Sequence, residues 1–103
     1  MTKSIRETKE SPVVQGVDER IAYTLTTTPW GSSPGTLSCA LKTLPGLVDV
    51  SAAKLTGSAT ASGDVITSPV VFGLASGQQY RLEFKFTISG NVFEAYVIIN
   101  GEE

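Results

Sequence analysis

Residues 80–88, which read Tyr-Arg-Leu-Glu-Phe-Lys-Phe-Thr-Ile, alternate apolar and polar side chains without interruption. A period of two places successive side chains on opposite faces of a β-strand, and a helix with this pattern would have no apolar stripe. The stretch therefore predicts a strand with one buried face, formed by Tyr80, Leu82, Phe84, Phe86 and Ile88.

The segment that follows predicts a hairpin. Ser89, Gly90 and Asn91 are turn-forming residues, and residues 92–99 are rich in β-branched and aromatic side chains. Both faces of this final strand carry apolar residues, more than a half-solvated strand needs. This final strand is therefore the candidate interaction surface, with Val92, Tyr96 and Ile98 as its candidate residues.

Upstream, shorter alternating segments predict further strands. Residues 12–14, 19–28, 36–42 and 65–72 have strand patterns separated by Gly, Pro and Asn or Asp, while residues 47–50 and 54–61 are weaker and suit short strands near an edge. Pro69 has no backbone N–H to donate, so it implies an edge strand or a bulge. Short strands about ten residues apart favour a β-sandwich over a βαβ fold.

Three residues that lead into the alternating strand suggest how the two sheets are linked. Leu74, Gly77 and Tyr80 are spaced three apart, which resembles the tyrosine corner of fibronectin type III and related sandwiches. The resemblance implies that the Tyr80 hydroxyl bonds to the upstream backbone and holds the crossover between sheets. The expected fold is all-β: a seven-strand, immunoglobulin-like, antiparallel Greek-key sandwich in which the Tyr80 strand is the sixth.

The composition of the chain argues against several classes of function. The chain has 103 residues, a net charge of −2, no histidine and a single cysteine, Cys39. The basic residues form no stripe that could follow phosphates, so nucleic acid is not an expected partner. Without histidine, the usual hydrolase triads and His-ligated metal sites cannot be built, and one cysteine excludes an intrachain disulfide. In the alternating segment 36–42, Cys39 lies on the same face as Leu37 and Leu41, which predicts a buried thiol.

The remaining candidate residues are interpreted as structural. Asp18 and Glu19 are adjacent, so their side chains diverge on a strand, and Asp49 and Asp64 occupy turns where carboxylates cap backbone donors. Trp30 is expected to cover the core at a strand end. No catalytic residue, metal ligand, cofactor or small-molecule substrate is predicted, and the protein is not expected to be an enzyme.

The chain is expected to divide into a charged arm at residues 1–10, one domain at residues 11–101 and a tail at residues 102–103. No stretch has the length and hydropathy of a signal peptide core or a membrane span. We therefore expect a complete, soluble small protein that stays in the cytoplasm where it is made.

Several of these features together resemble a family of small immunoglobulin-like proteins encoded among the structural genes of tailed bacteriophages and prophages. They are the charged arm ending at Lys9 and Pro12, the strand around Tyr23, the loop with Trp30, the corner from Gly77 to Tyr80, and the closing hairpin. The resemblance implies a head, neck or tail accessory protein that acts by contact with other virion or assembly proteins or with further copies of itself, first in the host cytoplasm and then in the virion.

Two other functions stay open at this point. A bacterial immunoglobulin-like adhesion or ligand-binding module would share the fold, although the missing signal peptide argues against export by the usual route. An enzyme is the least favoured alternative, because no carboxylates are paired at a workable spacing.

Overall fold

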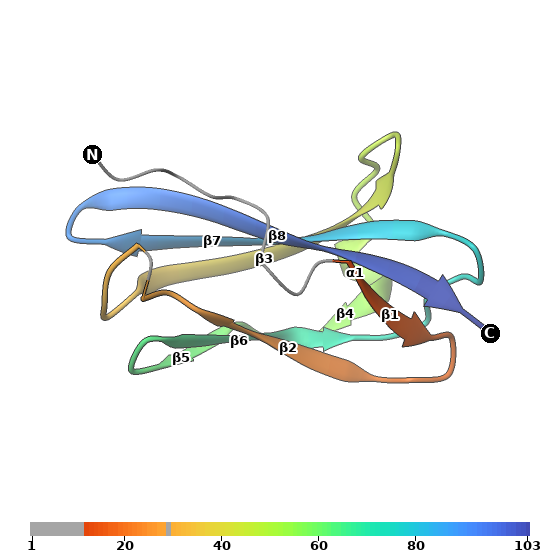
Figure 1. The fold of residues 1–103 in the computed structure, drawn as a ribbon, viewed down its shortest axis with the longest axis horizontal. Coiled ribbons are helices and arrows are strands. Elements are labelled where there is room, and N and C mark those ends of the chain that lie inside the picture. The colour runs from red at the N-terminus through yellow and green to blue at the C-terminus, as the bar shows by residue number, and fades with distance from the viewer. Residues whose placement is uncertain (1–11, 29) are drawn as a thin grey trace.

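The computed structural model describes residues 12–28 and 30–103. The arm expected at residues 1–10 lies outside the described part of the chain. Two β-sheets face one another as the layers of a sandwich (Figure 1). The elements are β1 (Val13–Gly16), β2 (Ile21–Thr26), β3 (Gly35–Leu44), α1 (Ser51–Lys54), β4 (Leu55–Thr56), β5 (Thr60–Ser62), β6 (Val65–Val71), β7 (Gln79–Ile88) and β8 (Asn91–Glu102).

The larger sheet has the strand order β1-β8-β7-β3. The predicted hairpin is present, with β7 and β8 antiparallel from the pair Ile88 and Asn91 to the pair Gln79 and Asn100. β1 runs parallel to the end of β8, where Val13 lies opposite Ile99. The final strand continues to Glu102, one residue into the predicted tail.

In the second sheet β6 is central, with β2 along one edge and β4 and β5 along the other. Thr67 of β6 is opposite Thr24 on one side and Thr60 on the other, so β2 and β5 must occupy different edges. β4 pairs with residues 70 and 71 further along β6. β4 and β5 are therefore two pieces of one interrupted edge strand.

The core fills the space between the sheets with the inward side chains of both. The alternation that predicts β7 is confirmed, because its apolar residues are buried while its charged residues lie on the other face. Thirteen buried apolar residues form one cluster: Leu25, Leu41, Ile66, Val71, Leu74, Tyr80, Leu82, Phe84, Phe86, Ile88, Ala95, Val97 and Ile99.

Two short edge strands were predicted between β3 and β6. The one at residues 54–61 is present as β4 and β5, whereas the prediction for residues 47–50 was wrong. Residues 47–50 form no strand, and only Asp49 makes an isolated bridge to Lys42. Leu47 has a φ of 55°, outside the strand range, and Asp49 Oδ1 accepts a hydrogen bond of 2.8 Å from Ser51 N, the first residue of α1. Gly57, with a φ of 91°, then separates β4 from β5.

Two placements were predicted for Pro69, an edge strand or a bulge. Pro69 lies beside a bulge in β6, the central strand of its sheet, so the edge position is excluded. The register of β2 against β6 shifts between Ala22 and Thr24, and Tyr23 is left without a ladder partner. The Ser68 hydroxyl replaces that partner, since Ser68 Oγ accepts a hydrogen bond of 2.9 Å from Tyr23 N and donates one of 2.7 Å to Pro69 O.

Tyr80 links the start of β7 to the loop before it. Its side chain is 1% exposed, and its hydroxyl oxygen accepts a hydrogen bond of 2.8 Å from Ala75 N. Between them Gly77 has a φ of 80°, a conformation that glycine adopts without strain. Gly77 N donates to Gly101 O at 3.0 Å, which ties this corner to the last strand.

We expect Tyr80→Phe to lower the free energy of unfolding by about 1–2 kcal/mol, because the ring stays buried while Ala75 N loses its acceptor. Urea denaturation monitored by tryptophan fluorescence measures this change. A variant as stable as the native protein would show that the hydroxyl does not hold the corner.

Gln15 joins the two sheets at the edge beside β1. Its side chain is fully buried, its Nε2 donates to Val71 O at 2.8 Å and to Glu19 O at 3.0 Å, and its Oε1 accepts from the Tyr23 hydroxyl at 2.7 Å. Burial and the nearby Glu19 carboxylate raise the pKa of Tyr23 to about 12, so the phenol stays a donor. Both Nε2 protons are used, as a buried amide requires.

Candidate interaction surface

The outer face is the face of the larger sheet that points away from the core. β8 alternates so that Phe93, Ala95, Val97 and Ile99 point inward, while the three residues predicted for contact, Val92, Tyr96 and Ile98, share the outer face with Glu94. Val92 is 60% exposed, whereas Tyr96 and Ile98 are half-buried and hold other contacts. Val14 of β1 adds a second aliphatic group that is 55% exposed.

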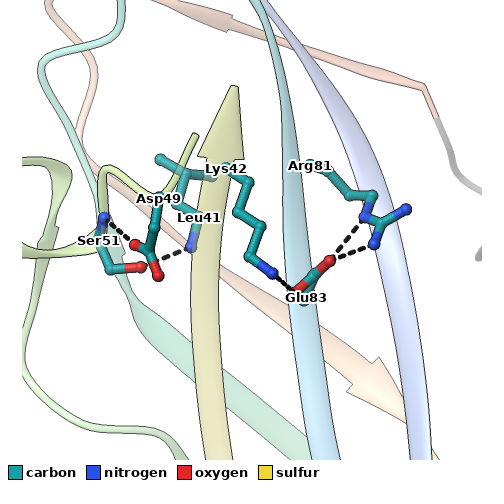
Figure 2. A network of polar contacts seen from close by, with 6 residues as sticks. All are labelled: Leu41, Lys42, Asp49, Ser51, Arg81 and Glu83. Carbon is teal, nitrogen blue, oxygen red and sulfur yellow. Dashed lines mark hydrogen bonds and ion pairs between the residues drawn. The ribbon is translucent and has the colours of Figure 1, made fainter. Parts of the chain in front are cut away.

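A charged ladder, formed by Lys42 of β3 and by Glu83 and Arg81 of β7, crosses the outer face (Figure 2). Lys42 Nζ lies 3.1 Å from Glu83 Oε1, and Arg81 Nε donates to Glu83 Oε2 at 2.7 Å. The Arg81 guanidinium carbon sits 4.8 Å above the centre of the Tyr96 ring. Each side chain in the ladder is therefore held by its neighbour, and Arg81 anchors the ring of Tyr96 by a cation–π contact.

The ladder controls the ionisation of its central carboxylate. Burial alone would raise the pKa of Glu83, but hydrogen bonds from Arg81 and Lys42 and their positive charges outweigh that effect and hold the pKa below its ordinary value. A lowered pKa in the fold means that the ionised carboxylate stabilises the protein above the unfolded-state pKa of about 4.5.

We expect Glu83→Gln to remove one source of acid destabilisation. The stability that ionised Glu83 contributes is present above about pH 4.5 and is lost as the pH falls through the lower, folded-state value. The effect is only tenths of a kcal/mol, because the pair is partly exposed to solvent. Urea denaturation at a series of pH values measures it, and parallel pH curves for the variant and the native protein would contradict it.

Asp49 and Ser51, at the other side of Figure 2, cap backbone donors. Hydrogen bonds from the side chain and backbone of Ser51 lower the pKa of Asp49. In the same cluster Ser51 Oγ accepts a hydrogen bond of 2.8 Å from Leu41 N. The capping interpretation of Asp49 agrees with this geometry.

A shallow hollow lies in the outer face beside the ladder. Its volume is about 120 Å³, and small side chains on β3 leave it open between charged neighbours; it is lined by Ser38, Cys39, Ala40, Glu83, Phe84, Lys85, Glu94 and Ala95. Burial raises the pKa of the Cys39 thiol to about 12, so the thiolate that a nucleophile or metal ligand needs is not formed near neutral pH.

Trp30 packs against the core rather than standing on the surface as a platform. Its ring meets Phe86 edge to face, with the ring centres 5.6 Å apart, and Phe86 stacks on Phe93 at 5.9 Å. Within residues 12–28 and 30–103, no three Cys, Asp or Glu side chains gather as a metal site would require. No helix in the same residues has the length and hydropathy to cross a membrane.

Two parts of the outer face could not be located from the sequence. The pattern of β7 places Arg81 and Glu83 outward, but only the register of three strands brings Lys42 and Tyr96 to them. Val14 was assigned to a first strand, and only the parallel pairing with β8 puts it on the same face as Val92. The alternation of residues 92–99 was the one signal present in the sequence, and it groups Val92, Tyr96 and Ile98 on one face of β8.

No protein-family model matches the chain, and comparisons with curated proteins and with solved structures give no significant match.

Proposed function

We propose that the sandwich has immunoglobulin-like topology. If β4 and β5 are counted as one interrupted strand, the chain has seven strands, with β2, β6 and β4/β5 in one sheet and β3, β7 and β8 in the other. Strands B-E-D and C-F-G of immunoglobulin domains follow these two orders, and β1 would be a first strand that has joined the C-F-G sheet. The bond from Ala75 N to the Tyr80 hydroxyl supports the same assignment.

The protein, in this proposal, acts by protein–protein contact and not by catalysis. The observation that carries it is the outer face, where exposed Val14 and Val92 flank a charged ladder whose side chains are already held in place. Aliphatic groups beside fixed Arg and Tyr side chains are the composition of contact surfaces, and preordered side chains lose little entropy on binding.

The setting proposed for this contact is a tailed bacteriophage or prophage, in which the protein is a structural or assembly component of the head, neck or tail. The support is the family resemblance of the charged arm, the Tyr23 strand, the Trp30 loop and the closing hairpin. The partners are other virion or assembly proteins, or further copies of this chain.

Mass spectrometry of phage particles purified after induction of the source bacterium tests this role. We expect the protein in intact particles at a fixed ratio to the capsid or tail proteins. A paired experiment with Val92→Asp, an exposed position whose replacement leaves the core intact, should lower its incorporation while the free protein stays folded. Particles without the protein, in a lysate where it is abundant, would contradict a virion role.

A further inference from the structure

The final strand β8 has two edges, and the alternation of its backbone groups tells which residues face each one. Gly101 N donates a hydrogen bond of 3.0 Å to Gln78 O, which directly precedes β7. Glu102 O accepts one of 2.7 Å from Val17 N, which directly follows β1. Successive residues of a strand direct their backbone groups to opposite sides, so odd-numbered residues of β8 face β7 and even-numbered residues face the side of β1.

β1 covers only the last part of this second edge. The two strands are parallel, in a register without a shift that begins with Val13 opposite Ile99. β8 itself begins at Asn91, and in the described ranges 12–28 and 30–103 no other strand is paired along this edge. The edge upstream of Ile99 therefore lies in the direction from which the chain enters β1.

Pro12, directly before β1, suits a strand that continues along β8. In the parallel ladder the odd-numbered residues of β1 face β8, as the bond from Val17 N to Glu102 O shows. Pro12 is even-numbered and exposed, so the N–H that proline lacks is one that would point away from β8. Proline at such a position removes no bond from the ladder, and it hinders the addition of a further strand beyond it.

We propose that the edge of β8 between Glu94 and Ile98 is the docking site of residues 8–11 of this same chain, in the register that β1 sets. Parallel pairing directs the chain that precedes Val13 along this edge, and two parallel strands advance by the same distance per residue, about 3.3 Å. The continued register sets residues 8–11 opposite residues 94–97.

Charge and tethering favour this occupant over a separate molecule. The register sets Glu10 opposite Tyr96, whose ring centre lies 4.8 Å from the Arg81 guanidinium carbon, so an acidic side chain comes beside a basic one. A segment tethered at Pro12 has an effective concentration of about millimolar at the edge, above that of a second molecule under ordinary conditions. Val92 lies outside the paired stretch, so the docking does not depend on the proposed virion role.

Hydrogen exchange of backbone amides in the isotope-labelled, full-length protein tests the docking. Ser11→Pro removes an N–H that the register directs at β8. The matched control, Thr8→Pro, removes an N–H that the register directs away from β8, as at Pro12. Neither variant changes the net charge, so the comparison isolates the backbone pairing.

The two edges of β8 supply an internal reference for this measurement. The amides of Tyr96 and Ile98 face the docking edge, while those of Ala95 and Val97 face β7. In Ser11→Pro the amides of the docking edge should exchange about tenfold faster than in the native protein or in Thr8→Pro, as expected for the loss of one hydrogen bond. The amides that face β7 should exchange equally in all three proteins.

Three results would overturn the proposal. In the native protein, exchange of the Tyr96 amide at the rate of a solvent-exposed amide would show that nothing docks at this edge, whatever the variants do. Equal exchange of the Tyr96 and Ile98 amides in Ser11→Pro and Thr8→Pro would show that residues 8–11 do not pair there. Protection of these amides that weakens on dilution would assign the edge to a second copy of the chain.

Discussion

Replacing Gly101 by Ala should lower the free energy of unfolding by about 3 kcal/mol, which is a large fraction of the total stability of a domain of this size. A Cβ atom at this position would lie 2.3 Å from Ala75 O and 3.4 Å from Gln78 O. Both neighbours are backbone atoms of the corner, and Gly101 is bonded to that corner through its own N–H and C=O. The collision can be relieved only by separating the last strand from the corner.

Gly35→Ala is the matched control, since Gly35 also lies in a strand of the larger sheet and a Cβ there meets no atom within 4 Å. We expect the free energy of unfolding of this variant to lie within about 0.5 kcal/mol of that of the native protein. Urea denaturation of both variants, with circular dichroism as the signal, separates the two cases. Equal stability of Gly101→Ala and Gly35→Ala would contradict the close packing of β8 against the corner.

Gln15→Glu should cost about 3 kcal/mol near pH 8, because the new carboxylate would be fully buried and would face two carbonyl oxygens where Nε2 now donates. Burial raises the folded-state pKa of the introduced carboxyl above its unfolded value of about 4.3. The protonated form is therefore favoured in the fold. The stability that the protonated carboxyl contributes to the variant is fully present below about pH 4.3 and is lost as the pH rises through the folded-state pKa.

Gln15→Met separates charge from lost hydrogen bonds. It keeps the length of the side chain but leaves the Tyr23 hydroxyl and the Val71 carbonyl without their partner, at a cost of about 2 kcal/mol. This cost should not change between about pH 5 and pH 8, because Met does not titrate. If the destabilisation by Gln15→Glu were equally flat over this range, Gln15 would not be buried in the native protein.

The sequence predicts best those elements whose pattern is local. The strands at residues 80–88 and 92–99 were located to within a few residues, because side-chain alternation and a turn signal define a hairpin without help from the rest of the chain. The β-sandwich class follows from the number and spacing of such strands. Seven strands and an immunoglobulin-like order stay predictions that the observed pairings support.

Other features depend on contacts between distant residues and could not be predicted. Residues 47–50 have a strand-like composition, yet Asp49 accepts a hydrogen bond from the first residue of a helical turn. The hydroxyl of Ser51 then accepts a hydrogen bond from Leu41 N at the edge of β3. Gln15 is a polar residue in a short strand, and its burial follows only from the position of β6. The charged ladder likewise depends on the register of β3 against β7, which no local pattern specifies.

The division of the strands between the two sheets is the central claim of this account, and nuclear Overhauser effects between backbone protons of the labelled protein test it most directly. We expect parallel cross-strand contacts that join Val13 to Ile99 and antiparallel contacts that join Leu25 to Ile66. These would place β1 beside β8 and β2 beside β6. Antiparallel contacts between β1 and β2, with none between β1 and β8, would contradict the sheet order and the immunoglobulin-like assignment that rests on it.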